Sequence, residues 1–306
     1  MTKNPPPPQD CLYIPVSELL AMFPDPNLRP AQRLAHFMKR YPETGRLVSQ
    51  FQQKGIPGHD QGWPDWIFLP TICFEHIVRE ARGETATAQS VAGEMCILGA
   101  LATWQYSQGI YLPGDLYLQE ELAKTPLTGE MPVERFRHLP QWCIYVRTPY
   151  MECLGEPLHG FWAYLAWDFK TGCETLALLL DLENDLCMLA MHIGPWSIRE
   201  GVQKIFDGSK KLAGELNEPG CKRVDNDVGE IAEALTPLIA IVLYLCSDTA
   251  EIEHEHTPGL WPAYPRAKKT RHGWKMFPAP QPTLWRYGKT AGALLRQAAE
   301  SNAERQ

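Results

Sequence analysis

A cysteine and a histidine in one aromatic stretch are the first candidates for nucleophilic catalysis. Cys143 lies in LPQWCIYVRTPY, residues 139–150, and His159 begins HGFWAYLAWD further along the chain. A cysteine nucleophile needs its histidine base within about 3 Å. If the two stretches pair as a β-hairpin centred between residues 153 and 154, Cys143 lies opposite position 164 and His159 opposite Thr148, about 16 Å apart along the sheet. The spacing favours a packed aromatic hairpin over a Cys–His active site.

The segment EIEHEH, Glu251–His256, is a candidate metal site. Glu251 and Glu255 share a helical face, whereas His254 and His256 share a strand face, so no regular element aligns all four side chains. The chain also lacks HExxH, the pattern that sets two zinc-binding histidines on one helical face. A solvated helix end explains the segment better than a metal site. We therefore predict no cofactor, no metal and no enzymatic activity.

Cysteine usage and hydropathy predict a cytoplasmic protein. The chain of 306 residues has nine cysteines, an odd number, and no CxxC pair. It therefore matches neither a disulfide scaffold nor a zinc ribbon. The longest apolar run, residues 235–246, contains Pro237 and is shorter than the roughly 20 residues that span a bilayer. The first ten residues, MTKNPPPPQD, lack the apolar centre of a signal peptide.

The charge is divided unevenly along the chain. From Tyr264 onward there are nine Lys and Arg residues and two acidic residues, a net charge of +7. Because the whole chain has a net charge of −7, residues 1–263 have a net charge of −14. Cations interleaved with an aromatic side chain suit single-stranded RNA, although a solvated loop is the alternative. The candidates for contact with RNA or the ribosome lie in PRAKKTRHGWK and are Arg266, Lys268, Lys269, Arg271 and Lys275. Tryptophans in expected loops are candidate anchors for a partner: Trp63, Trp66, Trp261 and Trp274.

The hydrophobic pattern predicts an α+β fold that carries these groups. We expect a disordered proline-rich arm over residues 1–12 and a single α+β core over 13–250. Within the core, residues 13–138 are expected to be helical, residues 140–193 to form a sheet, and residues 197–250 to return to helices. Residues 251–306 are expected to form a basic loop and a C-terminal helix.

Four apolar runs predict a central four-stranded antiparallel meander: WCIYV, FWAYLAW, TLALLLDL and LCMLAMHI. The second run is apolar on both faces, so we expect it to be covered on both sides. Ser197 and Glu200 have the spacing of a capping box at the start of a helix. Another helix is expected to begin near Asp227 and to restart at Thr236 and Pro237, with the threonine as cap and the proline at the first helical position.

The order and spacing of several segments resemble a family of type V-A anti-CRISPR proteins. The resemblance covers roughly residues 60–300 and is carried by ILGALATWQYSQGIYLPGD, LPQWCIYVRTP, LGEPLHGFWAYLAWD, LALLLDL, HIGPWSIREGV, PLIAIVLYLCSD and PQPTLWRYGKTAGALLRQ. Members of this family, carried by plasmids and phages, suppress biogenesis of the RNA-guided effector nuclease in the bacterial host. The resemblance implies an adaptor that binds the nuclease's N-terminal peptide during translation and causes loss of its mRNA. It implies no catalytic residue.

The aromatic neighbourhood around the hairpin is the predicted site for that peptide. Its candidates are Trp104, Tyr106, Tyr111, Trp142, Tyr145 and Trp162. For each of them a place in the hydrophobic core is the alternative. Two other functions stay open from the sequence: RNA binding through the basic C-terminal segment, and a metal-dependent ribonuclease that uses Glu251–His256.

Overall fold

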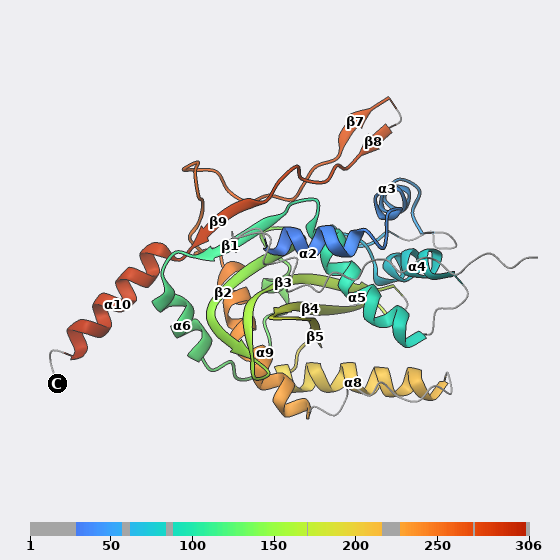
Figure 1. Ribbon diagram of the computed structural model, residues 1–306. Coiled ribbons are helices and arrows are strands. Elements are labelled where there is room, and N and C mark those ends of the chain that lie inside the picture. The colour runs from blue at the N-terminus through green and yellow to red at the C-terminus, as the bar shows by residue number, and fades with distance from the viewer. Residues whose placement is uncertain are drawn as a thin grey trace, which may run out of the picture.

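The computed structural model describes residues 29–56, 62–83, 88–169, 171–215, 227–271 and 273–303. The expected proline-rich arm, residues 1–12, lies outside the described residues. The centre of the fold is a seven-stranded mixed sheet with the strand order β5-β4-β3-β2-β1-β9-β6, sandwiched between two layers of helices (Figure 1).

Four consecutive antiparallel strands form one side of the sheet, as the apolar runs predict. Cys143 pairs with Tyr164, which is the expected register, and a bulge between Arg147 and Met151 shifts the pairing nearer the hairpin turn. These strands are β2 (Cys143–Cys153), β3 (Glu156–Asp168), β4 (Cys173–Leu182) and β5 (Leu186–His192).

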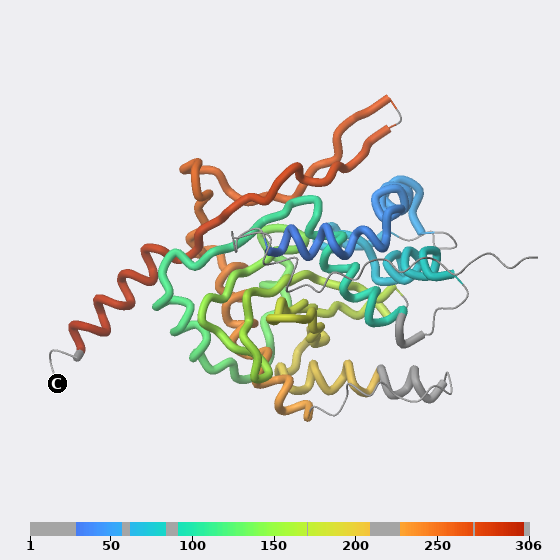
Figure 2. The backbone as a smooth tube through the Cα atoms, in the orientation of Figure 1, coloured from blue at the N-terminus to red at the C-terminus, as the bar shows by residue number. Residues whose placement is uncertain are grey.

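The expectation that the sheet is a four-stranded antiparallel meander is wrong, because three further strands extend it. One of them, β1, runs parallel to both β2 and β9, and β6 runs antiparallel to β9. All three lie in segments expected to be helix or loop: β1 (Gly109–Pro113), β6 (Ile252–His254) and β9 (Thr283–Tyr287). Figure 2 shows the chain returning late in the sequence to lie beside β1.

Two helical layers cover the two faces of the sheet. One layer consists of α2 (Arg29–Met38), α3 (Thr44–Lys54), α4 (Thr71–Arg82) and α5 (Ala88–Trp104). The other consists of α6 (Leu116–Lys124), the short α7 (Val133–Phe136), α8 (Ile198–Glu215) and α9 (Val228–Leu245). The core is therefore divided into two clusters, one on each side of the sheet.

Strand β3 contributes to both clusters, which confirms that it is covered on both sides. Phe161 and Ala163 join the cluster beneath α8 and α9, whereas Trp162 and Tyr164 join the cluster beneath α2 to α5. Successive side chains of a strand point to opposite faces, so a strand that is apolar throughout needs both layers.

The helix starts differ in how closely they follow their sequence signals. The capping box at Ser197 is confirmed: the Ser197 amide donates to Glu200 Oε2 at 2.8 Å, and the Glu200 amide donates to Ser197 Oγ at 3.3 Å. The start near Asp227 is confirmed, since Asp227 caps α9 and accepts from the Gly229 amide. The expected restart at Pro237 is wrong, because Pro237 lies inside α9 and the Thr236 hydroxyl donates to the Ala232 carbonyl. Helix α9 is thus long and apolar enough to cross a membrane by length and composition alone, with half of it buried in the protein.

Two elements project from the layered body (Figure 1). One is the C-terminal helix α10 (Lys289–Ala303), and the other is a separate two-stranded sheet of β7 (Lys268–Thr270) and β8 (Gly273–Lys275). The second element, with its flanking residues, carries the basic segment, which the sequence placed in a loop.

Candidate functional site

The predicted peptide-binding aromatics form a packed cluster whose centre lies inside the protein. The Tyr145 and Trp162 ring centroids are 4.7 Å apart, and the Trp104 ring packs on Trp162 at 6.1 Å. All three side chains are fully or almost fully buried. The Trp104 indole N–H donates to the Gly109 carbonyl at 2.9 Å, which fixes the C-terminal end of α5 against β1. These three residues therefore stabilise the contact between α5 and the sheet.

The remaining three candidates lie at separate places. Tyr106 is buried against Phe68, and Tyr111 is buried on the opposite face of the sheet, stacked on Trp285. Trp142 is partly exposed and donates its indole N–H to the Asp65 carbonyl. Because five of the six side chains offer almost no surface in this conformation, peptide contact at these residues stays a prediction.

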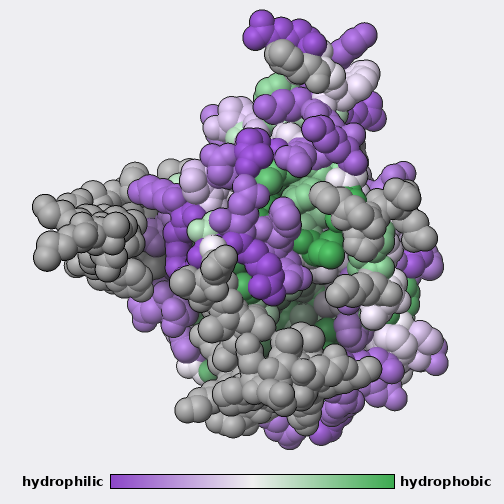
Figure 3. All heavy atoms as spheres, turned by 90° about the vertical axis from the view of Figure 1, so that its right-hand side faces the viewer, coloured by the Kyte–Doolittle hydropathy of each residue, from purple (hydrophilic) through white to green (hydrophobic). Residues whose placement is uncertain are grey.

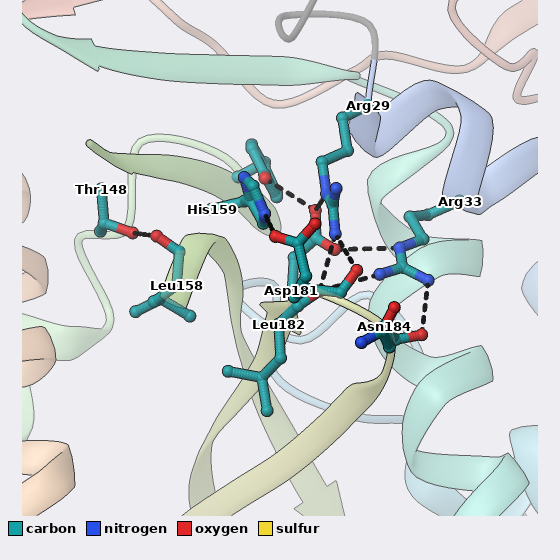
Figure 4. Close-up of polar contacts among 10 residues, drawn as sticks. Arg29, Arg33, Thr148, Leu158, His159, Asp181, Leu182 and Asn184 are labelled. Atoms are coloured by element: carbon teal, nitrogen blue, oxygen red, sulfur yellow. Dashed lines mark hydrogen bonds and ion pairs between the residues drawn. The ribbon is translucent and has the colours of Figure 1, made fainter. Parts of the chain in front are cut away.

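A charged network that the sequence did not indicate lies beside this cluster (Figure 4). Arg29 Nε and Arg33 Nε each donate to a different oxygen of Asp181 at 2.9 Å, and the Tyr145 hydroxyl donates to Asp181 Oδ2 at 3.0 Å. Asp181 is fully buried. Burial, followed by the adjacent carboxylate of Asp181, raises the pKa of Tyr145 well above its usual value.

The surplus positive charge of this network is directed to backbone oxygens. Both guanidinium groups donate to the Leu182 carbonyl, and each donates to one further carbonyl of the β4–β5 turn. A buried charge is tolerated when it is paired and its donors are satisfied. The network therefore fixes α2 to the end of β4 and leaves no open binding position of its own.

A groove between α6 and the β2 bulge is open to solvent. It has a volume of about 230 Å³, and we call it the α6–β2 groove; its lining residues are Leu116, Gln119, Glu120, Ala123, Lys124, Pro149, Tyr150 and Met151. Tyr150 is 93% exposed and has a φ of 65°. A bulky residue is rarely found in this left-handed region, and such strain occurs most often at functional positions.

One buried polar atom of a residue lining the α6–β2 groove lacks a partner among the described residues. Gln119 is only 2% exposed; its amide N–H donates to the Pro149 carbonyl at 3.1 Å, and its Oε1 accepts no hydrogen bond. Lys124 forms a salt bridge with Glu121 and is also attracted by Glu120, which itself forms no salt bridge in the described part of the chain. The groove thus offers a carboxylate outside any salt bridge and an exposed aromatic ring, whereas Gln119 Oε1 itself is buried.

The basic candidates gather on the projecting hairpin. Arg266, Lys268, Lys269, Arg271 and Lys275 are all exposed, and β7 and β8 pair Lys268 with Lys275 and Lys269 with Trp274. Trp274 is 62% exposed. The structure therefore brings the predicted RNA-contact residues together on one projection, which we call the basic arm (residues 266–275).

Neither predicted catalytic candidate forms a catalytic arrangement. Cys143 is fully buried, which raises the pKa of its thiol well above the usual value, and the sheet register keeps it apart from His159. A second pair, which the sequence did not reveal, brings Cys173 Sγ within 3.2 Å of His192 Nδ1 across β4 and β5. Burial raises the pKa of Cys173 and lowers the pKa of His192, so the neutral forms are favoured over the thiolate–imidazolium pair of an activated nucleophile.

The Glu251–His256 segment also has another role. Residues 252–254 form strand β6, not the expected helix end, and Glu251 Oε2 accepts from the Thr290 and Ala291 amides at the start of α10. Glu255 pairs with Arg286. In the residues that the structure describes, no group of three or more potential ligands is arranged for a metal ion.

These features define a three-layer protein with a buried polar network and two solvent-open candidate surfaces, the α6–β2 groove and the basic arm. Residues 115–306 match the model of the AcrVA2-like family, the anti-CRISPR type V subtype A2 family. The chain belongs to this family, which confirms the resemblance seen in the sequence. No curated protein matches the chain in a sequence comparison.

A structural comparison extends the similarity beyond the matched residues. The crystal structure of AcrVA2 superimposes on this chain with a TM-score of 0.60, covering 88% of this chain and 87% of that chain. The two sequences are 16% identical. At that identity the comparison shows a shared fold and says nothing about individual residues of the groove or the arm.

Proposed function

We propose that this anti-CRISPR protein lowers production of the type V-A RNA-guided nuclease by binding its N-terminal peptide during translation. Loss of the nuclease mRNA follows, and the protein acts as an adaptor in the cytoplasm of the bacterial host. Membership of the type V subtype A2 family supports the target system. Recognition of the nascent peptide explains how one message is selected without a domain that reads RNA sequence.

The observation that carries the peptide-binding step is the exposed Tyr150, which has a left-handed backbone and lines the solvent-open α6–β2 groove. Its ring offers an apolar contact to a side chain of an extended peptide laid in the groove. Glu120, which forms no salt bridge among the described residues, suits a Lys or Arg of the peptide. This groove replaces the buried aromatic cluster as our preferred peptide site.

The test is a titration of the purified protein with a fluorescent peptide that has the N-terminal sequence of the nuclease. We expect saturable binding of the native peptide and none of a scrambled one. Tyr150→Ala is expected to weaken binding by about 30-fold, the loss typical of an interface hot spot. Glu120→Gln is expected to weaken it less, with a larger effect at low salt.

Glu233→Gln is the matched control, because Glu233 is an exposed carboxylate on α9, outside the groove. It is expected to bind the peptide as the wild type does. Equal binding of the native and scrambled peptides would contradict the proposal. Unchanged binding by both groove variants would move the peptide site away from α6 and β2.

The metal-dependent ribonuclease has no support in the geometry of the Glu251–His256 segment, where the two glutamates bind the α10 amides and Arg286. If the protein were such a ribonuclease, the purified protein would degrade RNA without ribosomes and a chelator would stop the reaction. We expect no such degradation.

A further inference from the structure

The basic arm carries like charges in positions that folding alone does not favour. Lys268 lies directly opposite Lys275 in the β7–β8 ladder, and directly opposed like charges destabilise a strand pair. Lys268, Lys269 and Lys275 form no ion pair with a carboxylate in the part of the chain that the structure describes. Lys275 Nζ lies 5.8 Å from the centre of the Phe277 ring, but none of these three charges is neutralised by a carboxylate among the described residues. Positive charge is therefore concentrated on a two-stranded element outside the main sheet.

The same arm presents an aromatic ring beside these charges. Trp274 lies opposite Lys269 in the ladder, so the two side chains are on the same face, and Lys268 and Lys275 lie on the other. The indole is 62% exposed, although burial of so large an apolar side chain is normally favourable. An exposed tryptophan flanked by cations is the arrangement that binds an unpaired base and its backbone phosphates.

A pocket at the base of the arm gives this surface a second wall. Its volume is about 490 Å³, and α3 and the arm line it together through Ser49, Gln52, Gln53, Ala267, Gly273, Trp274, Lys275 and Met276. Gln53 donates its amide N–H to the Trp274 carbonyl at 2.9 Å, and Gln52 donates to Met276 Sδ at 3.3 Å. These bonds use amide donors and leave both amide oxygens available to accept from the amino groups of a base.

The view of this side of the molecule supports an open surface. Figure 3 shows hydrophilic residues around and above an area where hydrophobic residues are visible. Figure 1 shows the arm standing clear of the main sheet, above α3 and α4. A strand of nucleic acid can therefore approach the arm without moving a layer of the fold.

We propose that the basic arm is a single-stranded RNA-binding surface, in which an unpaired base stacks on Trp274 over the pocket shared with α3 and the arm lysines hold the adjacent phosphates. The acidic remainder of the chain repels RNA elsewhere, so binding is confined to the arm. This surface goes beyond the proposed peptide recognition and uses none of the groove residues.

The test is fluorescence anisotropy of the full-length protein with labelled single-stranded oligo(U) and oligo(A), a blunt RNA duplex, and poly-glutamate as a competing polyanion. We expect both single strands to bind more tightly than the duplex, because a paired base cannot stack on Trp274. Trp274→Ala is expected to weaken binding by about 5- to 100-fold and to leave the salt dependence unchanged. Lys275→Gln is expected to reduce the slope of log K against log salt by about 0.7.

Matched controls separate this surface from general charge and from the groove. Trp261→Ala removes an equally exposed tryptophan outside the arm, and Lys289→Gln removes an exposed lysine at the start of α10. Both should bind RNA as the wild type does, and Tyr150→Ala should do the same. Trp274→Ala should retain peptide binding.

Four results would overturn the inference: no RNA binding, equal binding of the duplex, arm variants that match the wild type, or displacement of RNA by poly-glutamate at equal charge concentration. The last result would assign the arm to an acidic protein. Since peptide binding is measured on the same variants, failure of the RNA surface is distinguishable from failure of the proposed function.

Discussion

Arg29 and Asp181 lie 152 positions apart in the chain, yet Arg29 Nε donates to Asp181 Oδ2 at 2.9 Å inside the protein. This pair joins the first described helix to the end of β4, and the Tyr145 hydroxyl connects it to the aromatic cluster. The network therefore fixes α2 and β2 relative to the same buried carboxylate.

Replacement of this carboxylate is expected to destabilise the fold strongly. Asp181→Asn removes the buried carboxylate that both Arg29 and Arg33 bond and leaves them only the weaker attraction of the exposed Glu183. We expect the free energy of unfolding to fall by about 3–5 kcal/mol. Urea unfolding measures the loss. Asp185→Asn is the control, since Asp185 is exposed at the β4–β5 turn, and it should change stability little. A small loss in Asp181→Asn would mean that the network does not secure α2.

Removal of Trp162 separates a core role from a binding role. Its side chain is fully buried against Trp104 and Tyr145. We expect Trp162→Ala to lower the free energy of unfolding by about 3–5 kcal/mol. Replacement of the partly exposed Trp142 by alanine is expected to lower the free energy of unfolding by less. A Trp162→Ala protein that kept its melting temperature but lost the peptide would restore the aromatic cluster as the peptide site.

The half-buried His192 makes part of the stability depend on pH. Burial lowers its pKa below the ordinary value of 6.5, Lys204 lowers it further, and Asp168 opposes the shift. The unfolded chain therefore takes up this proton at a higher pH than the folded chain does. The contribution of neutral His192 to the free energy of unfolding is complete above pH 6.5. It is lost as the pH falls from 6.5 through the lower pKa that His192 has in the folded state.

The measurement is urea unfolding of the wild type and His192→Gln from about pH 8 to about pH 5. We expect the wild type to lose more stability than the variant over this range. His76→Gln, which removes an exposed histidine on α4, should keep the slope of the wild type. Parallel curves of unfolding free energy against pH for the wild type and His192→Gln would show that His192 does not contribute to the pH dependence of stability.

The sequence predicted the local features of the fold better than the distant ones. The register of Cys143 opposite Tyr164 and the capping box at Ser197 depend on neighbouring residues, and both are present. Strand β1 has only five residues and ends in a proline, and its parallel partner β9 lies at the far end of the chain. No hairpin spacing signals such a pair, so β1 and β9 were expected to be helix or loop.

The candidate surfaces were predictable to different degrees. The basic arm was visible as a run of cations with one tryptophan, although its hairpin form was not. The left-handed backbone of Tyr150 leaves no sequence signal, because glycine is the residue that normally marks such a conformation. The burial of Trp104 and Trp162 could be predicted from the sequence. Trp104 lies in the segment 89–107, which is apolar nearly all round, and Trp162 lies in a strand that is apolar on both faces.

The most direct test of the central claim is the level of a reporter mRNA in bacteria that express this protein. One reporter begins with the first codons of the nuclease in frame, and the second carries almost the same nucleotides shifted by one position, so that it encodes a different peptide. We predict that the in-frame mRNA is lost and the frame-shifted mRNA is unchanged. Equal loss of both messages would contradict recognition of the nascent peptide, and so would loss of neither.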